Sequence, residues 1–201
     1  MSLVNYATRE ITCKIVYYGP GRSGKTTNLH YIYSQVPSNR KGQMVSLATQ
    51  TDRTLFFDFL PIDLGVISGF STRFQLYTVP GQVYYQTTRK LVLHGADGVV
   101  FVADSQARQL DENMESLQDL HANLADHGVD ARRLPFVMQY NKQDLPADLI
   151  LGVPELEEQL NFRGVPSFAA DALHGRGVFE SLRALSEQVL RKLSNPGGGQ
   201  R

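Results

Sequence analysis

The 201-residue chain is long enough to bury a core as one domain, and its hydrophobic fraction of 42% is ordinary for a globular protein. Lysine and arginine together number 20, as do aspartate and glutamate, so the formal net charge is zero. That balance gives no support to a nucleic-acid partner or to strong attraction to an anionic membrane. No apolar run approaches the roughly 20 residues that cross a bilayer, so we expect no transmembrane segment.

Several features predict a cytoplasmic protein without a lipid anchor. The single cysteine, Cys13, cannot form an internal disulfide, which indicates a reducing compartment. The N-terminus lacks the basic and apolar regions of a signal peptide. Ser2 excludes myristoylation, and the C-terminal Gly-Gly-Gln-Arg has no cysteine to prenylate.

The first half of the chain predicts strands separated by glycine turns. An apolar, β-branched strand is expected over residues 11–18, with Cys13 in the sheet, and a helix over 25–35. Strands at 54–60 and 73–79 flank a turn region at 64–69, which favours an antiparallel hairpin. A helix is expected at 83–94.

The second half alternates more regularly. In chain order we expect a strand at 98–103, a helix at 108–126, a strand at 134–140, a helix at 154–161, a strand at 165–169 and a final amphipathic helix through 179–193. Within the helix at 108–126, one apolar stripe is predicted to consist of Leu110, Met114, Leu117, His121 and Leu124.

This order predicts an α/β fold of three layers. A mostly parallel central sheet with one antiparallel strand has helices on both faces. We expect a single domain over residues 1–194 and a disordered tail at 195–201, where Asn-Pro is followed by three glycines. Ligands of such sheets bind at the carboxyl ends of the strands, where the motifs below all fall.

Residues 19–26 match the phosphate-binding pattern G-x-x-x-x-G-K-[ST] between an expected strand and an expected helix. Glycines let the backbone wrap close to phosphate, and the helix N-terminus adds its positive end. Lys25 is expected to reach the β- and γ-phosphates, and the Thr26 hydroxyl to bind Mg²⁺. The predicted nucleotide contacts here are Gly19, Gly21, Arg22, Ser23, Gly24, Lys25, Thr26 and Thr27.

Asn141-Lys142-Gln143-Asp144 follows the strand expected at 134–140. The Asp144 carboxylate can accept from both N1–H and the 2-amino group of guanine, which adenine cannot satisfy. Asn141 can bind N7 and brace the loop, and the Lys142 stem can lie along the base with its ammonium near the phosphate loop. Backbone contacts are expected at Ala172 and Leu173. The motif alone is a weak signal, but its position after a phosphate loop favours a guanine nucleotide.

With these motifs in place, the chain resembles Ras-like small GTPases, and more specifically the bacterial MglA-type GTPases. The resemblance covers residues 1–194 and is most specific in the segments Asp52 to Phe59 and Tyr77 to Gln82, and it includes Lys14 to Gly21 and Gln139 to Lys142. It implies a GTP hydrolase that binds GTP and GDP with Mg²⁺.

Thr78 departs from most Ras-like proteins, which place an aspartate there to hold Mg²⁺ through water; a threonine is typical of MglA-type proteins. The metal would then depend on Thr26, on Thr54 and on the phosphates, with Asp52 or Asp58 as candidate helpers. Leu173 replaces a common lysine. Arg22 inside the phosphate loop has no explanation from sequence.

Hydrolysis requires an oriented water and positive charge at the γ-phosphate. Gln82, directly after Gly81, is predicted to orient the water, and Thr54 and Gly81 to sense the γ-phosphate. Arg53 is predicted to act as an arginine finger, as the resemblance implies; a surface arginine is the alternative.

The resemblance also implies a partner and a role. The partner is a roadblock-type homodimer of the MglB kind, which accelerates otherwise slow hydrolysis, and effectors bind the GTP state. The role is cell polarity in gliding or pilus-driven motility, with recruitment to a cell pole through partners. A nucleotide-dependent scaffold with negligible hydrolysis stays open as the alternative, favoured by Thr78 and opposed by Gln82 and Arg53. The phenylalanines at 56, 57 and 59, with Tyr84 and Tyr85, could form a state-dependent apolar surface or pack in the core.

Overall fold

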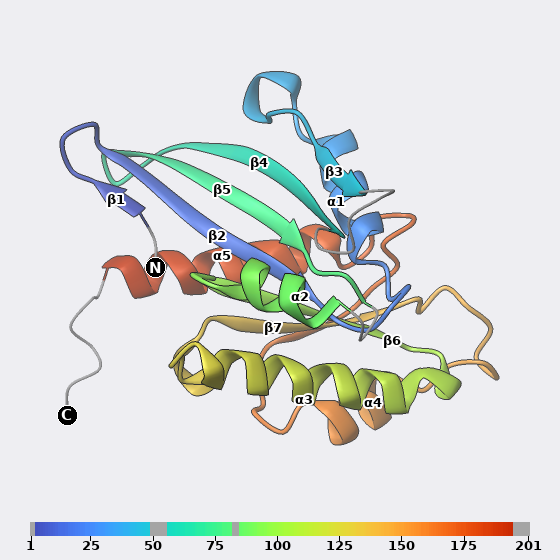
Figure 1. The fold of residues 1–201 in the computed structure, drawn as a ribbon. Helices are drawn as coiled ribbons and strands as arrows, with labels where there is room; N and C mark the ends of the chain where they lie inside the picture. The colour runs from blue at the N-terminus through green and yellow to red at the C-terminus, as the bar shows by residue number, and fades with distance from the viewer. Residues whose placement is uncertain (1–2, 49–55, 82–84, 195–201) are drawn as a thin grey trace.

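The computed structural model describes residues 3–48, 56–81 and 85–194. A central sheet runs through the molecule, with helices against both faces (Figure 1). The strands are β1 (Leu3–Asn5), β2 (Glu10–Tyr18), β3 (Val45–Ala48), β4 (Phe56–Ile67), β5 (Phe70–Thr78), β6 (Gly98–Asp104), β7 (Phe136–Asn141) and β8 (Ser167–Ala169). The helices are α1 (Lys25–Gln35), α2 (Gln86–Leu93), α3 (Leu110–Asp126), α4 (Val153–Leu160) and α5 (Val178–Ser194), with 3₁₀ turns at Ser38–Arg40, Ala107–Gln109 and Ala131–Arg133.

The strand order in the sheet is β3-β4-β5-β2-β6-β7-β8, and β1 pairs with the start of β2. From β5 to β8 neighbouring strands are parallel, whereas β4 is antiparallel to β5. Strands β6 and β7 are buried along their whole length, as expected for parallel strands covered on both faces. The predicted three-layer fold with a mostly parallel sheet is therefore confirmed, but β1 as well as β4 runs antiparallel to its neighbour, where one antiparallel strand was expected.

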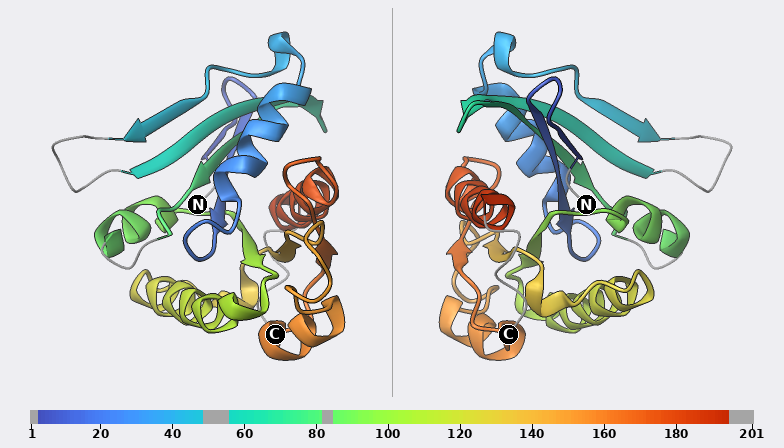
Figure 2. Two further views of the ribbon diagram at one scale, coloured as in Figure 1. Left: turned by 90° about the vertical axis from the view of Figure 1, so that its right-hand side faces the viewer. Right: turned by 90° about the vertical axis from the view of Figure 1, so that its left-hand side faces the viewer.

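Two apolar clusters fill the space on either side of the sheet. One joins β2, β4 and β5 to α1 and α5 through residues such as Ile15, Leu29 and Leu185. The other joins the opposite face to α2, α3 and α4 through residues such as Val16 and Leu120. Figure 2 shows α1 and α5 on one face and α2 and α3 on the other. Cys13 is fully buried in the first cluster, as predicted.

The hairpin of β4 and β5 is longer than predicted. The expected turn region at 64–69 is strand up to Ile67, and the turn consists of Ser68 and Gly69 alone. The register shifts between Asp63 and Gly65, so the first glycine is at a bulge rather than in a turn. Strands β1 and β3 were not predicted from the sequence.

The stripe predicted on α3 is partly wrong. His121 is exposed, while the buried positions include Leu117, Leu120 and Leu124. Polar residues on this face, Asn113 and Asn123, are also buried because their amides bond to Asp104 and to Tyr18. Within the described ranges no helix has the length and apolar character that a bilayer crossing requires. The tail at 195–201 lies outside the described residues, and the domain boundary stays a prediction.

Candidate functional site

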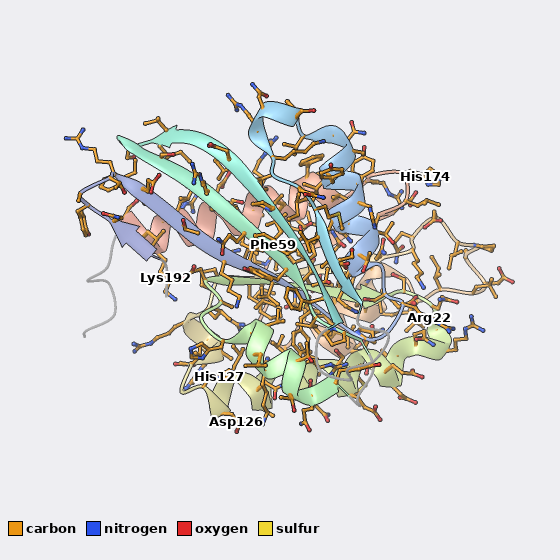
Figure 3. The ribbon with its side chains drawn as sticks, turned by 45° about the horizontal axis from the view of Figure 1, so that its top comes forward. Arg22, Phe59, Asp126, His127, His174 and Lys192 are labelled. Atoms are coloured by element: carbon orange, nitrogen blue, oxygen red, sulfur yellow. The ribbon has the colours of Figure 1, made fainter. Side chains whose placement is uncertain are left out.

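The phosphate loop connects β2 to α1 at the carboxyl end of the sheet. Its turn needs glycine at position 24, where φ is +102° and an added Cβ would lie 2.1 Å from the Asn141 amide nitrogen. Arg22 also has a positive φ, +62°, and its side chain is exposed. Arg22 and His174 lie at the same end of the molecule in Figure 3, so the two loops that carry them share one edge of the sheet.

A cavity of about 560 Å³ opens beside this loop. Among the predicted nucleotide contacts, its walls include Arg22, Gly24, Lys25, Thr26, Thr27 and Gly81. Gly19, Gly21 and Ser23 complete the loop without lining the cavity. The Ser23 hydroxyl is buried and has no hydrogen-bond partner among the described residues.

Lys25 is 6% exposed, and its ammonium donates to the carbonyl oxygens of Gly19 (3.0 Å) and Pro20 (2.6 Å). Burial, with the charge of Arg89 acting in the same direction, lowers the pKa of Lys25 to about 7, although Asp58 opposes the shift. The nearby Asp58 carboxylate therefore does not offset the cost of burying the Lys25 charge. A polyphosphate in the cavity would supply further negative charge and keep Lys25 protonated.

Asp58 on β4 lines the cavity and accepts several hydrogen bonds there. Its carboxylate accepts from the hydroxyls of Thr26 (2.6 Å), Ser46 (2.7 Å) and Thr78 (2.8 Å), and the side chain is almost fully buried. The Asp58 amide in turn donates to the Thr78 hydroxyl, 2.9 Å away. Antiparallel pairing of β4 with β5 brings this carboxylate beside Thr78, the position at which most Ras-like proteins carry one.

The loop that follows β7, at residues 141–144, is tied to the phosphate loop through Asn141. The Asn141 amide donates to the Ser23 carbonyl (2.7 Å), and its oxygen accepts from the Ala172 amide (2.8 Å). This side chain therefore braces both loops, as predicted from its position. Ala172 is buried, whereas Leu173 is largely exposed.

Asp144 is exposed, and its carboxylate lies within 4.8 Å of a carboxylate oxygen of Asp171 and a ring nitrogen of His174. Asp171 accepts from the backbone of Leu173 and His174 and contacts the His174 ring. Burial acts to raise the pKa of Asp171, but these hydrogen bonds outweigh it and hold the pKa below its usual value. Asp171 therefore shapes the loop that carries the predicted backbone contacts.

Lys142 has a left-handed backbone, with φ of +72°, and its ammonium forms an ion pair with the buried Asp104. The predicted position of the Lys142 ammonium near the phosphate loop stays a prediction. Asp104 ends β6, next to Asn141 in register, so the pair links two strand ends. The reading of the base by Lys142 and Asp144 stays a prediction.

Three predicted residues, Arg53, Thr54 and Gln82, lie outside the described residues, as do the candidate Asp52 and Tyr84. Phe57 lines the cavity and, like Phe59, packs beside Tyr77, with ring centroids 5.9 Å and 4.9 Å away. Both phenylalanines are half-buried, which is intermediate between the two predicted alternatives, an apolar surface and packing in the core.

Comparisons with known proteins decide the family. The model of the ADP-ribosylation factor family matches residues 2–189. The mutual gliding-motility protein MglA of Myxococcus xanthus is 56% identical over 197 residues, covering 98% of this chain and 100% of its own length. The chain belongs to the ADP-ribosylation factor family and is an MglA-type Ras-like GTPase.

More distant relatives agree with this placement of the MglA-type GTPase. ADP-ribosylation factor-like protein 6 of Caenorhabditis briggsae is 30% identical over 186 residues, covering 89% of this chain and 87% of its own length. The protein of the same name from Caenorhabditis elegans is 28% identical over 188 residues, with 90% and 88% covered. The chain is thus a guanine-nucleotide-binding protein and a GTP hydrolase, as predicted.

Proposed function

We propose that this MglA-type GTPase is a molecular switch that binds GTP and GDP with Mg²⁺ and hydrolyses GTP slowly on its own. The observation that carries the proposal is the convergence of the Thr26, Ser46 and Thr78 hydroxyls on the buried Asp58 carboxylate, in the wall of the cavity beside the phosphate loop. Asp58 thus places a carboxylate beside Thr78, the position at which most Ras-like proteins have an aspartate for Mg²⁺.

The donor set fits Mg²⁺, because hard cations of this size prefer carboxylate and hydroxyl oxygens together with water and phosphate. Thr26 and Thr54 would hold the ion, and Asp58 would hold its water shell or the Thr26 hydroxyl in place. When bound, Mg²⁺ neutralises charge on the β- and γ-phosphates. The chain's own part is to orient the oxygens: Ser46 and Thr78 donate to Asp58 and so fix its carboxylate.

The nucleotide would lie across the two braced loops. The backbone amides of residues 19 and 21–26 and the Lys25 ammonium bind the phosphates, and Asp144 reads guanine, with Asn141 fixing the distance between the two subsites. Thr54 and Gly81 contact the γ-phosphate, so its loss on hydrolysis releases both. Gln82 orients the attacking water, and Arg53 stabilises charge in the transition state.

The cellular role follows from the relative. The name of the Myxococcus xanthus protein assigns it to gliding motility, and the match spans both chains almost completely. We infer that the present chain controls cell polarity or motility in its own cell and is recruited to a pole through partners. A roadblock-type homodimer of the MglB kind would accelerate hydrolysis by fixing Arg53 and Gln82.

A single-turnover GTP hydrolysis assay tests the switch. Protein loaded with GTP and Mg²⁺ is followed alone and with a roadblock-type partner, and the expected result is slow turnover that the partner accelerates. Persistent GTP under both conditions, with binding intact, would instead support a scaffold that only binds nucleotide. Absence of guanine-nucleotide binding would remove the proposal.

A further inference from the structure

Arg89 on α2 is a buried arginine with contacts on both sides of its guanidinium. It is 2% exposed. Its Nε donates to the Pro80 carbonyl (2.8 Å) and one Nη to the Gly81 carbonyl (2.5 Å), while the other Nη pairs with Asp119 on α3 (2.7 Å). Arg89 therefore connects the loop in front of the phosphate cavity to a helix that takes no part in the site.

The acidic partner of this arginine is itself held in place. The Tyr18 hydroxyl donates to Asp119, and the Asn123 amide donates to both Asp119 (3.1 Å) and the Tyr18 oxygen (3.0 Å). The guanidinium carbon lies 5.6 Å from the centroid of the Tyr18 ring. With β2 and α3 both anchoring Asp119, the guanidinium has little freedom to turn, because a buried charge must keep its partners.

The contact with the Pro80 carbonyl fixes the direction of one backbone amide. A trans peptide unit is planar, and its C=O and N–H point to opposite sides. The Pro80 carbonyl belongs to the same peptide unit as the Gly81 N–H. Because that carbonyl faces Arg89, the Gly81 N–H must face away from Arg89. Gly81 lines the phosphate cavity, whereas Arg89 does not.

The loop at Gly81 lies directly against the phosphate loop. A Cβ added to Gly81 would be 2.2 Å from the Gly21 Cα and 2.4 Å from the Gly21 nitrogen, so only glycine fits this approach. The Gly81 amide therefore lies beside the loop at residues 19–26 that is proposed to hold the phosphates. The rest of the protein must then set the direction in which the Gly81 N–H points.

We propose that Arg89 is a positioning residue that aims the Gly81 amide at the γ-phosphate, with Asp119 and Tyr18 as its anchor. The inference rests on the proposed function, in which Gly81 senses the γ-phosphate. It adds the group that makes this sensing specific for the triphosphate. GDP has no γ-phosphate to accept a hydrogen bond from the Gly81 amide, so GDP binding does not depend on Arg89.

The test compares two affinities in each variant. Nucleotide-free protein with Mg²⁺ is titrated with GDP and with a non-hydrolysable GTP analogue, and the ratio of the two dissociation constants is recorded for the wild type, Arg89→Gln and Arg89→Lys. We expect GDP affinity within about twofold of the wild type, and analogue affinity weaker by about tenfold in Arg89→Gln, the loss typical of a charge-assisted hydrogen bond. Arg89→Lys should restore only part of this, because lysine cannot hold two carbonyls and a carboxylate in one plane.

A matched control lies one residue along the same helix. Lys90 pairs with Asp126 across α2 and α3, but this pair is exposed. Asp126 lies at the far end of α3 from Arg22 in Figure 3. Lys90→Gln removes an ion pair between the same two helices without touching Pro80 or Gly81, and it should leave the ratio unchanged.

Asp119→Asn and Tyr18→Phe keep the test open if Arg89→Gln does not fold, because they loosen the anchor while the arginine stays. Both should shift the ratio in the same direction by less than Arg89→Gln. Equal losses of affinity for GDP and the analogue, or an unchanged ratio in every folded variant, would show that Arg89 is purely structural. That result would overturn this inference but not the proposed function. A wild type that binds neither nucleotide would overturn the proposed function with it.

Discussion

Selectivity for guanine is assigned to one exposed carboxylate, that of Asp144, which lies close to Asp171 and His174. Asp144→Asn replaces an acceptor with a group that can also donate. We expect weaker GDP binding and improved binding of the xanthine nucleotide, whose 2-oxo group prefers a donor. Titrations with GDP and XDP measure the change. If the two affinities keep their wild-type ratio, Asp144 does not read the base.

Asp58 is the residue on which metal binding is proposed to depend. Asp58→Asn keeps the shape of the side chain but removes its charge from beside Thr26 and Lys25. The ratio of GDP affinity in Mg²⁺ to that in EDTA should fall by roughly 10–100-fold, the usual cost of losing a group that orients a metal ligand.

Asp63 on the same strand provides the control for this prediction. Its carboxylate accepts from the Gly65 amide at the bulge and does not line the cavity. Asp63→Asn should therefore leave the Mg²⁺ dependence as it is in the wild type. An Asp58→Asn protein with a normal dependence would assign the metal to Thr26, Thr54 and the phosphates alone.

At the scale of elements, the β4–β5 hairpin depends on its two-residue turn. Ser68 and Gly69 both have positive φ, +51° and +84°, as a type I′ turn requires. An added Cβ at Gly69 would meet nothing within 4 Å, so Gly69→Ala isolates the backbone cost. We expect a loss of about 1–2 kcal/mol in the free energy of unfolding, measured by urea denaturation.

Asparagine separates backbone strain from a general effect of adding a side chain at this turn. It adopts the left-handed conformation more readily than alanine does, so Gly69→Asn should lose less stability than Gly69→Ala. Equal losses in the two variants would mean that the positive φ is not what makes glycine favourable here.

The elements that the sequence predicted best have strong local signals. The buried strand before the phosphate loop is rich in β-branched residues, and the loop has glycines at fixed spacing, so Lys25 could be placed at the start of the following helix from the sequence. Asn141 and Asp144 could likewise be placed at and just after the end of a buried strand. Strands β1 and β3 have only three and four residues, which is too short for an alternating pattern to stand out in the sequence, although each pairs with the strand that follows it.

Other parts of the candidate site depend on long-range pairing. Asp58 was only one of two candidate helpers, because its place beside Thr78 follows from the register of β4 and β5. Arg89 was missed altogether, since a charged residue on α2 suggests a solvent-exposed face. Its spacing before Val92 and Leu93, on the buried side of the helix, was the available signal.

At the scale of the whole molecule, the sheet positions every loop of the proposed nucleotide site. The phosphate loop follows β2, the loop with Gly81 follows β5, and the loop with Asn141 and Asp144 follows β7. These strands are parallel, so all three loops lie at the carboxyl end of the sheet. Through Asp58, β4 joins this end of the sheet, and through Arg89 and Asp119 helices α2 and α3 do so as well. We therefore expect a change at the γ-phosphate to reach the face of the sheet that α2 and α3 cover, where a partner or effector would sense it.

Hydrolysis is the property that this arrangement is proposed to control, and it depends on Gln82 and Arg53. Both should act on the transition state more than on bound GTP. We expect Gln82→Leu and Arg53→Ala to bind GTP with nearly native affinity and to hydrolyse it far more slowly. An arginine finger contributes roughly 10³–10⁵ in rate, so partner-stimulated turnover should fall by at least about tenfold in Arg53→Ala even if the finger is imperfectly placed.

Single-turnover assays of these variants with the roadblock-type partner also separate a switch from a scaffold. A switch enzyme would remain in its triphosphate form and hold its partner persistently, because release follows hydrolysis. A scaffold with negligible hydrolysis would show no change, since it has no turnover to lose. Stimulated turnover that is unchanged in Arg53→Ala but lost in Gln82→Leu would place the positive charge on the partner, and the water-orienting role of Gln82 would stand without an arginine from this chain.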